Sequence, residues 1–212
     1  MNDNIIENAI RFAEECFKND SSGHDIDHTL RVYRTAVRLA ERENADKKIT
    51  ALAALLHDVD DRKLSPETAE SKSRARAFLK EQGAEEEAEK IIRIISQVSF
   101  VGTDSPVPDS IEGKCVQDAD RLDAIGAIGI ARAFSFGADR KRKMYDPDVK
   151  PLEGAKSSEY LAERENTTLN HFYEKLFLLK DMMNTDSAKR LAEGRDRLMH
   201  LFVESFLEEW NG

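Results

Sequence analysis

The stretch ALAALLHDVDD, from Ala51 to Asp61, joins an apolar segment to a group of ionisable side chains. A helix that is apolar on every side is normally buried among other helices. Burial of such a helix would carry His57 and Asp58 inward, where polar groups without partners are costly. A divalent metal ion would compensate the imidazole and the carboxylate together. The stretch therefore predicts a buried metal site at the end of a helix.

Further nitrogen and oxygen ligands are available at His28 and in an acidic cluster of Asp118, Asp120 and Asp123. Imidazole and carboxylate together suit Mn, Fe, Co, Ni or Zn better than Ca. Four protein ligands would leave positions open for water and a substrate oxygen, as in a catalytic site. Asp118 and Asp120 lie roughly 200° apart on a helix, so both cannot face one ion. Each residue alone also has a structural explanation, as a hydrogen-bonded core histidine or as a capping or solvated aspartate.

A competing metal motif is the string HDIDH from His24 to His28, which is close to the HExxH helix of zinc proteases. That motif requires both histidines on one face of an intact helix, and Asp25 stands where the glutamate would be. Ser21–Gly23 precedes His24, and Asp27 is expected to cap the next helix. The helix would then begin between the two histidines, which argues against a zinc protease.

Taken in order, His28, His57-Asp58 and Asp120 resemble the H…HD…D signature of the HD-domain metal-dependent phosphohydrolases. The string GHDIDHTLRV at 23–32 is similar to the family's GHDxxHxxRV motif, and ADRL at 119–122 is similar to its last ligand segment. DADRLDAIGAIGIAR at 118–132 and HFYEKL at 171–176 are similar to the small stand-alone bacterial HD hydrolases. Nucleoside-triphosphate pyrophosphohydrolysis is known in that subgroup. The similarity extends over residues 20–206.

The resemblance implies one divalent metal ion held by His28, His57, Asp58 and Asp120. Mn²⁺ is the first expectation, and Co²⁺, Ni²⁺, Fe²⁺, Zn²⁺ and Mg²⁺ are alternatives, because all accept nitrogen and oxygen ligands. Such an ion lowers the pKa of a bound water and neutralises charge on a phosphate group.

Catalysis also requires a general base, for which Asp61 is the candidate. It lies four residues after His57, and the corresponding place in the stringent-response HD hydrolases is a catalytic acid. Alternatively, Asp61 is a helix-end or ion-pair residue beside Arg62 or Lys63. His24 is a further catalytic candidate, either as a support behind the metal ligands or as an acid toward a leaving phosphate. Lys63 is another, as a cation toward phosphate, whereas Asp60 is expected to be solvated.

Phosphate oxygens beyond the metal require cationic partners. Arg31 follows His28 by three residues and shares its helical face, and Arg121 adjoins Asp120. His171 and Lys175 form a further pair at helical spacing. Each of these side chains has solvation as its alternative. The basic run at 140–143 is either a lid over polyphosphate or simply solvated.

Apolar residues recur at helical spacing along the chain, and no alternating β pattern is present. The first expected helices lie at 3–19, after a cap at Asp27, and from a cap at Asp46 to a stop near Asp60–Lys63. Further helices are expected from Ser65-Pro66 to Gly83 and at 88–98, 110–124, 125–136, 158–183 and 187–209, the last capped by Asp186. Small residues at 126–133 should let neighbouring backbones approach closely. These patterns predict one all-α HD domain over residues 1–212, with a flexible loop at 140–157.

The 212-residue chain has a formal charge of −9, which argues against general nucleic-acid binding. Its two cysteines, Cys16 and Cys115, are far apart in apolar contexts and predict reduced thiols. No signal peptide or membrane span is visible, so we expect a cytoplasmic protein, monomeric or homodimeric.

The predicted activity is metal-dependent hydrolysis of a nucleotide, with a nucleoside triphosphate losing pyrophosphate. A nucleotide monophosphatase or an alarmone hydrolase of the same fold is the close alternative. A metal- or nucleotide-binding sensor without turnover is the alternative from a different class.

Overall fold

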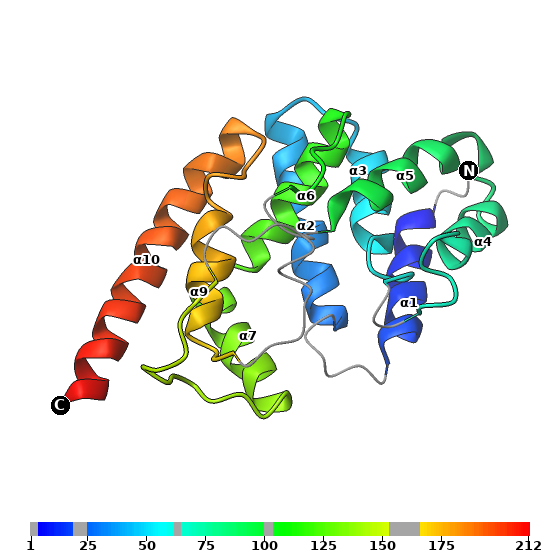
Figure 1. Cartoon of the computed structure of the whole chain (residues 1–212). Helices are drawn as coiled ribbons and strands as arrows, with labels where there is room; N and C mark the ends of the chain where they lie inside the picture. The colour runs from blue at the N-terminus through cyan, green and yellow to red at the C-terminus, as the bar shows by residue number, and fades with distance from the viewer. Residues whose placement is uncertain (1–3, 19–24, 62–64, 100–103, 153–165) are drawn as a thin grey trace. The chain divides into compact units, whose positions relative to one another are not determined.

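The computed structural model describes residues 4–18, 25–61, 65–99, 104–152 and 166–212. Every regular element within these ranges is helical, which confirms the all-α prediction (Figure 1). The chain divides into two compact units, one formed by residues 1–99 and 106–120 and the other by residues 100–105 and 121–212. The prediction of a single domain stays a prediction.

Helix α3 (Lys47–Leu56) is the central element of the first unit. It contacts α1 (Ile5–Phe17), α2 (Ile26–Arg42) and α5 (Glu85–Val98). Every side chain from Ile49 to Leu56 is buried, as expected for a helix that is apolar on all sides. Asp46 caps its first turn as predicted, accepting hydrogen bonds from the backbone N of Lys48 (2.8 Å) and of Ile49 (3.0 Å).

Two predicted helix starts in the first unit were wrong. The cap of α2 is Asp25 and not Asp27, because the Asp25 carboxylate accepts the His28 N–H at 2.7 Å. Asp27 lies in the first turn, where a negative charge still favours the helix dipole. Helix α4 (Ser73–Glu81) begins well after Ser65, and residues 66–72 form turns.

The predicted end of α3 was also wrong, since the helix stops at Leu56 and His57 is its C-cap. The next residues form a turn whose hydrogen bonds span three residues, where those of an α-helix span four. They run from Val59 N to Leu56 O (3.4 Å) and from Asp61 N to Asp58 O (3.0 Å). The His–Asp doublet therefore lies on a turn that follows a buried helix, and not within the helix itself.

Helix α6 (Ile111–Asp123) begins in the first unit and ends in the second. The second unit otherwise contains α7 (Gly126–Asp139), α9 (Asn170–Glu174), the short 3-10 helix η1 (Leu176–Leu178) and α10 (Asp186–Asn211). Helices α7 and α10 contact each other. Phe134 of α7 packs against Phe202 and Phe206 of α10, with ring centroids 5.7 and 6.0 Å apart.

The long helix expected at 158–183 is absent from its described part, residues 166–183, which hold only α9 and η1. Polar side chains compete for the backbone here. Thr167 Oγ1 accepts the Asn170 N–H at 3.2 Å, and the buried Glu174 carboxylate accepts the Leu152 N–H at 3.0 Å. Thr185, and not Asp186, caps α10.

Gly137 of α7, beyond the small-residue stretch at 126–133, packs closely against the side chain of Thr168. A Cβ atom added there would clash with Thr168 Oγ1 and would lie 3.2 Å from Thr168 Cβ. Glycine is therefore needed for the chain at Thr168 to lie against α7.

Candidate functional site

The imidazole of His57 is held at the end of α3 by the backbone of its own helix. Its Nδ1 lies 2.8 Å from the carbonyl oxygen of Ala54, and the residue is only 4 % exposed. A carbonyl accepts and cannot donate, so Nδ1 carries a hydrogen in this contact. In the neutral tautomer, Nε2 therefore presents a lone pair.

Three further side chains meet His57 inside the first unit. Nε2 of His57 lies 3.2 Å from Oδ2 of Asp58, and Nε2 of His28 lies 3.5 Å from the same oxygen. His28 Nε2 is also 3.5 Å from Oδ1 of Asp120 on α6. One ligand atom each from His28, His57 and Asp120 lies within 4.8 Å of the others. The fold thus brings together the four residues predicted as metal ligands, from α2, the end of α3 and α6.

The electrostatics of this cluster favour a cation. Burial lowers the pKa of His57, but the charges of Asp58 and Asp120 prevail and raise it to about 9. Nε2 of His57 is buried and finds no hydrogen-bond partner among the described residues, although the Asp58 carboxylate is adjacent. A lone pair beside a carboxylate is unfavourable unless a proton or metal ion lies between them. Two imidazoles and two carboxylates fit a divalent transition metal.

Asp118, the competitor for the fourth ligand position, is fully buried, whereas the Asp120 side chain is 25 % exposed. The group of atoms close enough to hold one ion comprises His28, His57 and Asp120, and it includes neither Asp118 nor Asp58.

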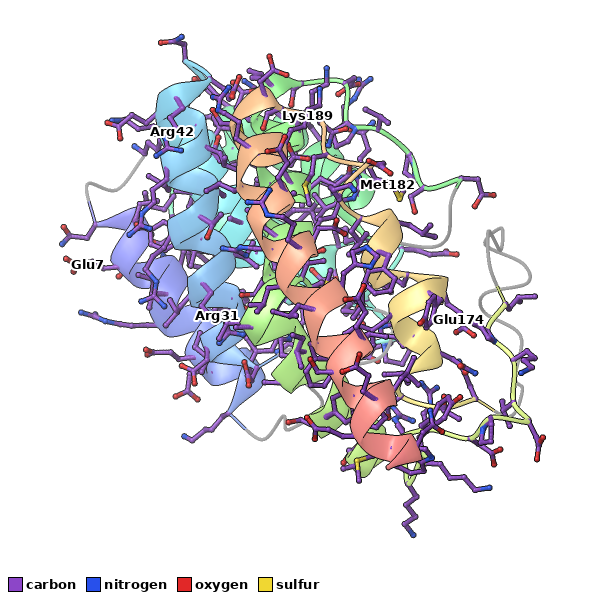
Figure 2. All side chains as sticks on the ribbon, turned by 90° about the vertical axis from the view of Figure 1, so that its left-hand side faces the viewer. Glu7, Arg31, Arg42, Glu174, Met182 and Lys189 are labelled. Atoms are coloured by element: carbon purple, nitrogen blue, oxygen red, sulfur yellow. The ribbon has the colours of Figure 1, made fainter. Side chains whose placement is uncertain are left out.

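The predicted catalytic residues are only partly described by the structure. Asp61 is half-buried and directly follows the turn that carries Asp58. His24 and Lys63 lie outside the described residues. Arg31 lies on α2, three residues after His28, and is half-buried (Figure 2).

The remaining predicted phosphate ligands belong to the second unit. Arg121 is 3 % exposed, and its guanidinium donates to the carbonyl oxygen of Met182. His171 is in α9 and Lys175 is its C-cap residue, and both are half-buried. Their role in phosphate binding stays a prediction.

Asp60 was expected to be solvated, and that expectation was wrong. It is completely buried, and its carboxylate accepts hydrogen bonds from the backbone N of Arg74 (3.2 Å) and of Ala75 (3.0 Å). The sequence did indicate that Asp60 needs a partner, because a charged side chain directly after a buried apolar helix is costly to leave unpaired. The partner could not be identified because the start of α4 was misplaced.

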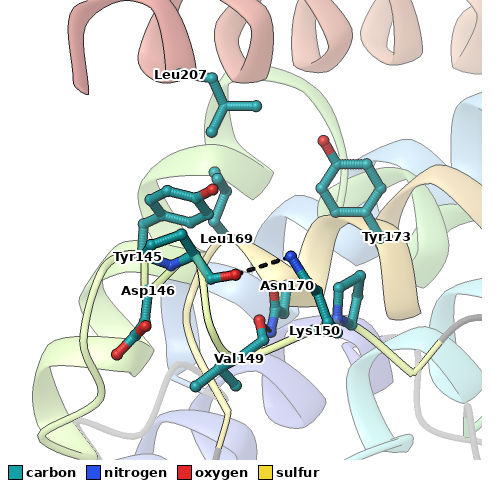
Figure 3. A pocket seen from close by; sticks show the side chains of 10 residues that line it. Tyr145, Asp146, Val149, Lys150, Leu169, Asn170, Tyr173 and Leu207 are labelled. Atoms are coloured by element: carbon teal, nitrogen blue, oxygen red, sulfur yellow. Dashed lines mark hydrogen bonds between the residues drawn. The ribbon is translucent and has the colours of Figure 1, made fainter. Parts of the chain in front are cut away.

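The second unit contains a separate pocket of about 180 Å³ (Figure 3). It is lined by Tyr145, Asp146, Pro147, Val149, Lys150, Pro151, Leu169, Asn170, Tyr173 and Leu207. Two of its polar side chains bind backbone carbonyls of the pocket itself: Lys150 Nζ donates to Pro147 O at 2.8 Å, and Asn170 Nδ2 donates to Val149 O at 2.9 Å. No residue predicted for metal binding or catalysis lines this pocket.

Residues 140–152, the described part of the predicted loop, contain no helix or strand. The guanidinium groups of Arg140 and Arg142 lie 5.3 and 5.5 Å from the centre of the Phe136 ring. Among the described helices, none is long and apolar enough to cross a membrane.

Comparison with known proteins links the whole chain to one group. A family model for the HD domain matches residues 25–125. The Bacillus subtilis protein YpgQ is 41 % identical over 204 residues, which cover 95 % of this chain and 91 % of YpgQ.

Three solved structures extend this similarity. A Lactobacillus plantarum protein is 40 % identical, with a TM-score of 0.87 over 100 % of this chain and 99 % of that one. An HD-superfamily hydrolase from Bacillus thuringiensis is 44 % identical, with a TM-score of 0.75 over 98 % and 97 % of the two chains. YpgQ in complex with ADP has 36 % identity in the structural alignment and a TM-score of 0.72, over 95 % and 97 %.

Proposed function

Since the chain belongs to the HD superfamily, we propose that it is a metal-dependent phosphohydrolase that splits a nucleoside triphosphate into the monophosphate and pyrophosphate. The main evidence for the metal site is the buried Nε2 of His57, which lies beside the Asp58 carboxylate. The crystal structure of YpgQ with ADP supports a nucleotide as the ligand.

In this proposal, His28, His57, Asp58 and Asp120 hold one divalent ion, with Mn²⁺ as the first expectation. The bound ion would supply Lewis acidity toward phosphate oxygens and would make water more acidic. The Ala54 carbonyl holds Nδ1 of the His57 ring, so Nε2 is the nitrogen that would bind the ion.

Asp61 is the proposed general base, because it is half-buried and hydrogen-bonded through its backbone to Asp58. Its carboxylate would accept a proton from water as the water oxygen forms a bond to phosphorus. The phosphorus attacked is that of the α-phosphate. Its bond to the oxygen shared with the β-phosphate breaks, and the electrons of that bond leave with pyrophosphate. His24 is the proposed proton donor to that leaving group, and Lys63, Arg31, Arg121, His171 and Lys175 are the proposed cationic contacts to phosphate.

The proposal is tested by assaying the EDTA-treated protein after addition of Mn²⁺, Co²⁺, Ni²⁺ or Mg²⁺. Nucleoside triphosphates, monophosphates and a guanosine alarmone serve as substrates, with phosphate and pyrophosphate measured separately. We expect equimolar monophosphate and pyrophosphate from a triphosphate, and no turnover by the Asp58→Ala variant. Phosphate release from monophosphates would instead identify a monophosphatase, and pyrophosphate release from the alarmone alone would identify an alarmone hydrolase. Nucleotide binding without turnover would identify a sensor.

The role of Asp61 is tested with Asp61→Asn, which keeps the shape of the side chain but removes its basicity. We expect unchanged metal content and a kcat reduced by about 10²-fold or more, because general bases typically contribute 10²–10⁴-fold. Steady-state kinetics and elemental analysis of the same sample measure both quantities. Wild-type kcat in Asp61→Asn would remove Asp61 as the base.

A further inference from the structure

Asp60 is a fully buried charge that the proposed reaction does not use. Both of its carboxylate oxygens are occupied, because Oδ1 accepts the Arg74 N–H and Oδ2 accepts the Ala75 N–H, at 3.2 and 3.0 Å. These two donors lie in the first turn of α4, where backbone N–H groups have no partner within the helix.

Helix α4 lacks a cap of its own. Its N-cap residue is Lys72, whose side chain can only donate, and no side-chain cap hydrogen bond is formed there. The backbone of Lys72 is also left-handed, with φ of 53°, a conformation that residues other than glycine seldom adopt. Asp60 therefore supplies the acceptor that an Asp or Ser at the N-cap position would normally provide.

The start of α4 binds the turn in return. Lys72 Nζ donates to the carbonyl oxygen of Asp60 at 3.3 Å. The Arg74 guanidinium donates to the carbonyl oxygen of Val59 at 3.4 Å and to Ser65 Oγ at 2.8 Å. Hydrogen bonds thus run in both directions between α4 and residues 59–60, which immediately follow Asp58.

We propose that Asp60 and Arg74 are positioning residues that hold the turn after His57 against α4, and thereby set the place of Asp58 in the metal site. This inference rests on the proposed metal site and deepens it. The Asp58 carboxylate is 3.2 Å from His57 Nε2 and 3.5 Å from His28 Nε2, so a small shift of the turn changes both separations. Neither Asp60 nor Arg74 needs to contact the ion.

The test compares Asp60→Ala with Asp46→Ala, a matched control at the other end of α3. Asp46 also caps a helix through two backbone N–H groups, but it is exposed and distant in sequence from the His–Asp turn. Mn²⁺ affinity is measured by calorimetry and by the electron paramagnetic resonance of free Mn²⁺, at a temperature where both variants are folded. Kcat is then measured as a function of Mn²⁺ concentration.

Asp60→Ala should bind Mn²⁺ about 10–100-fold more weakly, as is typical when a support of a metal ligand is removed. Excess Mn²⁺ should restore most of its kcat, because the four ligands are still present. Asp60→Asn should lie between the wild type and Asp60→Ala, since a carboxamide offers one acceptor oxygen in place of two. Asp46→Ala should lose stability while keeping wild-type Mn²⁺ affinity.

Equal Mn²⁺ affinity in Asp60→Ala, Asp46→Ala and the wild type would overturn the positioning role and leave the proposed function intact. If Asp60→Ala does not fold, the Arg74→Met variant takes its place in the test. We expect this variant to bind Mn²⁺ more weakly than the wild type, and unchanged Mn²⁺ affinity would overturn the inference. Absence of metal binding and turnover in the wild type would instead refute the proposed function.

Discussion

The two ring nitrogens of His57 face different partners, and this difference sets the chemistry of the site. Nδ1 is 2.8 Å from the carbonyl oxygen of Ala54, while Nε2 is 3.2 Å from the Asp58 carboxylate. A neutral imidazole has one N–H, and the carbonyl requires it. The nitrogen that faces Asp58 is then basic, and it gains stability by binding a proton or a metal ion.

This arrangement predicts that metal binding depends on pH. In the metal-free protein the raised pKa of His57 contributes stability that is full below 6.5 and is lost as pH rises through about 9. A metal ion must displace that proton, so the apparent Mn²⁺ affinity should rise by about tenfold per pH unit from neutrality toward pH 9. Calorimetry in two buffers of different ionisation enthalpy should detect at least one proton released. An affinity independent of pH would contradict protonation of His57 in the metal-free site.

A second prediction concerns which aspartate is the fourth metal ligand. Asp120→Ala should abolish stoichiometric metal in elemental analysis, because it removes an oxygen that lies 3.5 Å from His28 Nε2. Asp118→Ala, two residues away on the same helix, is the matched control and should retain the metal. Circular dichroism must show that both variants are folded, since Asp118 is fully buried. The reverse result would assign the ligand to Asp118.

Helices and the turns between them determine how rigid the site is. Helix α3 is buried on all sides, so its C-terminal end, with His57, has little freedom to move. Asp58 and Asp61 follow on a turn that lacks the regular hydrogen bonds of a helix, and α4 binds the other side of that turn.

In the second unit, the close packing of α7 at Gly137 should make this position sensitive to an added methyl group. Gly137→Ala should lower the free energy of unfolding by about 1–3 kcal/mol, because the new methyl group would clash with Thr168. Gly194→Ala in α10 is the control, since its added Cβ would meet only Arg197 Nη2, at 3.9 Å. That change should stabilise the helix by about 0.5–1 kcal/mol. Urea denaturation measures both, and equal effects of the two variants would contradict the packing argument.

For the whole molecule, metal binding should be coupled to stability. An ion that binds only the folded protein stabilises it by about 2.7 kcal/mol at a free concentration of 100 times Kd. For a chain of this size that corresponds to a rise in Tm of about 5–10 °C. We expect a single unfolding transition that shifts as a whole with Mn²⁺, as for one cooperative domain, and no shift in Asp120→Ala. Two calorimetric transitions, of which only one responds to Mn²⁺, would contradict the single-domain prediction.

The helical class and the set of residues able to bind a metal could both be predicted from the amino-acid sequence. Helical spacing of apolar residues is a local property, and it predicted α1, α5, α6 and α10 to within a few residues. The apolar run before His57 required burial, and the resemblance to the HD hydrolases selected the same four residues that the fold brings together.

The partners of the polar side chains could not be predicted from the sequence and are known only from the folded structure. Asp60 looked like a solvated neighbour of Asp61, yet it caps a helix that begins at Ser73. The guanidinium of Arg121 donates to the carbonyl oxygen of Met182, a partner that the sequence around Asp120 does not indicate. The reason is physical: each polar group has many acceptable partners along the chain. The partner it finds depends on long-range packing, which one-dimensional spacing does not encode.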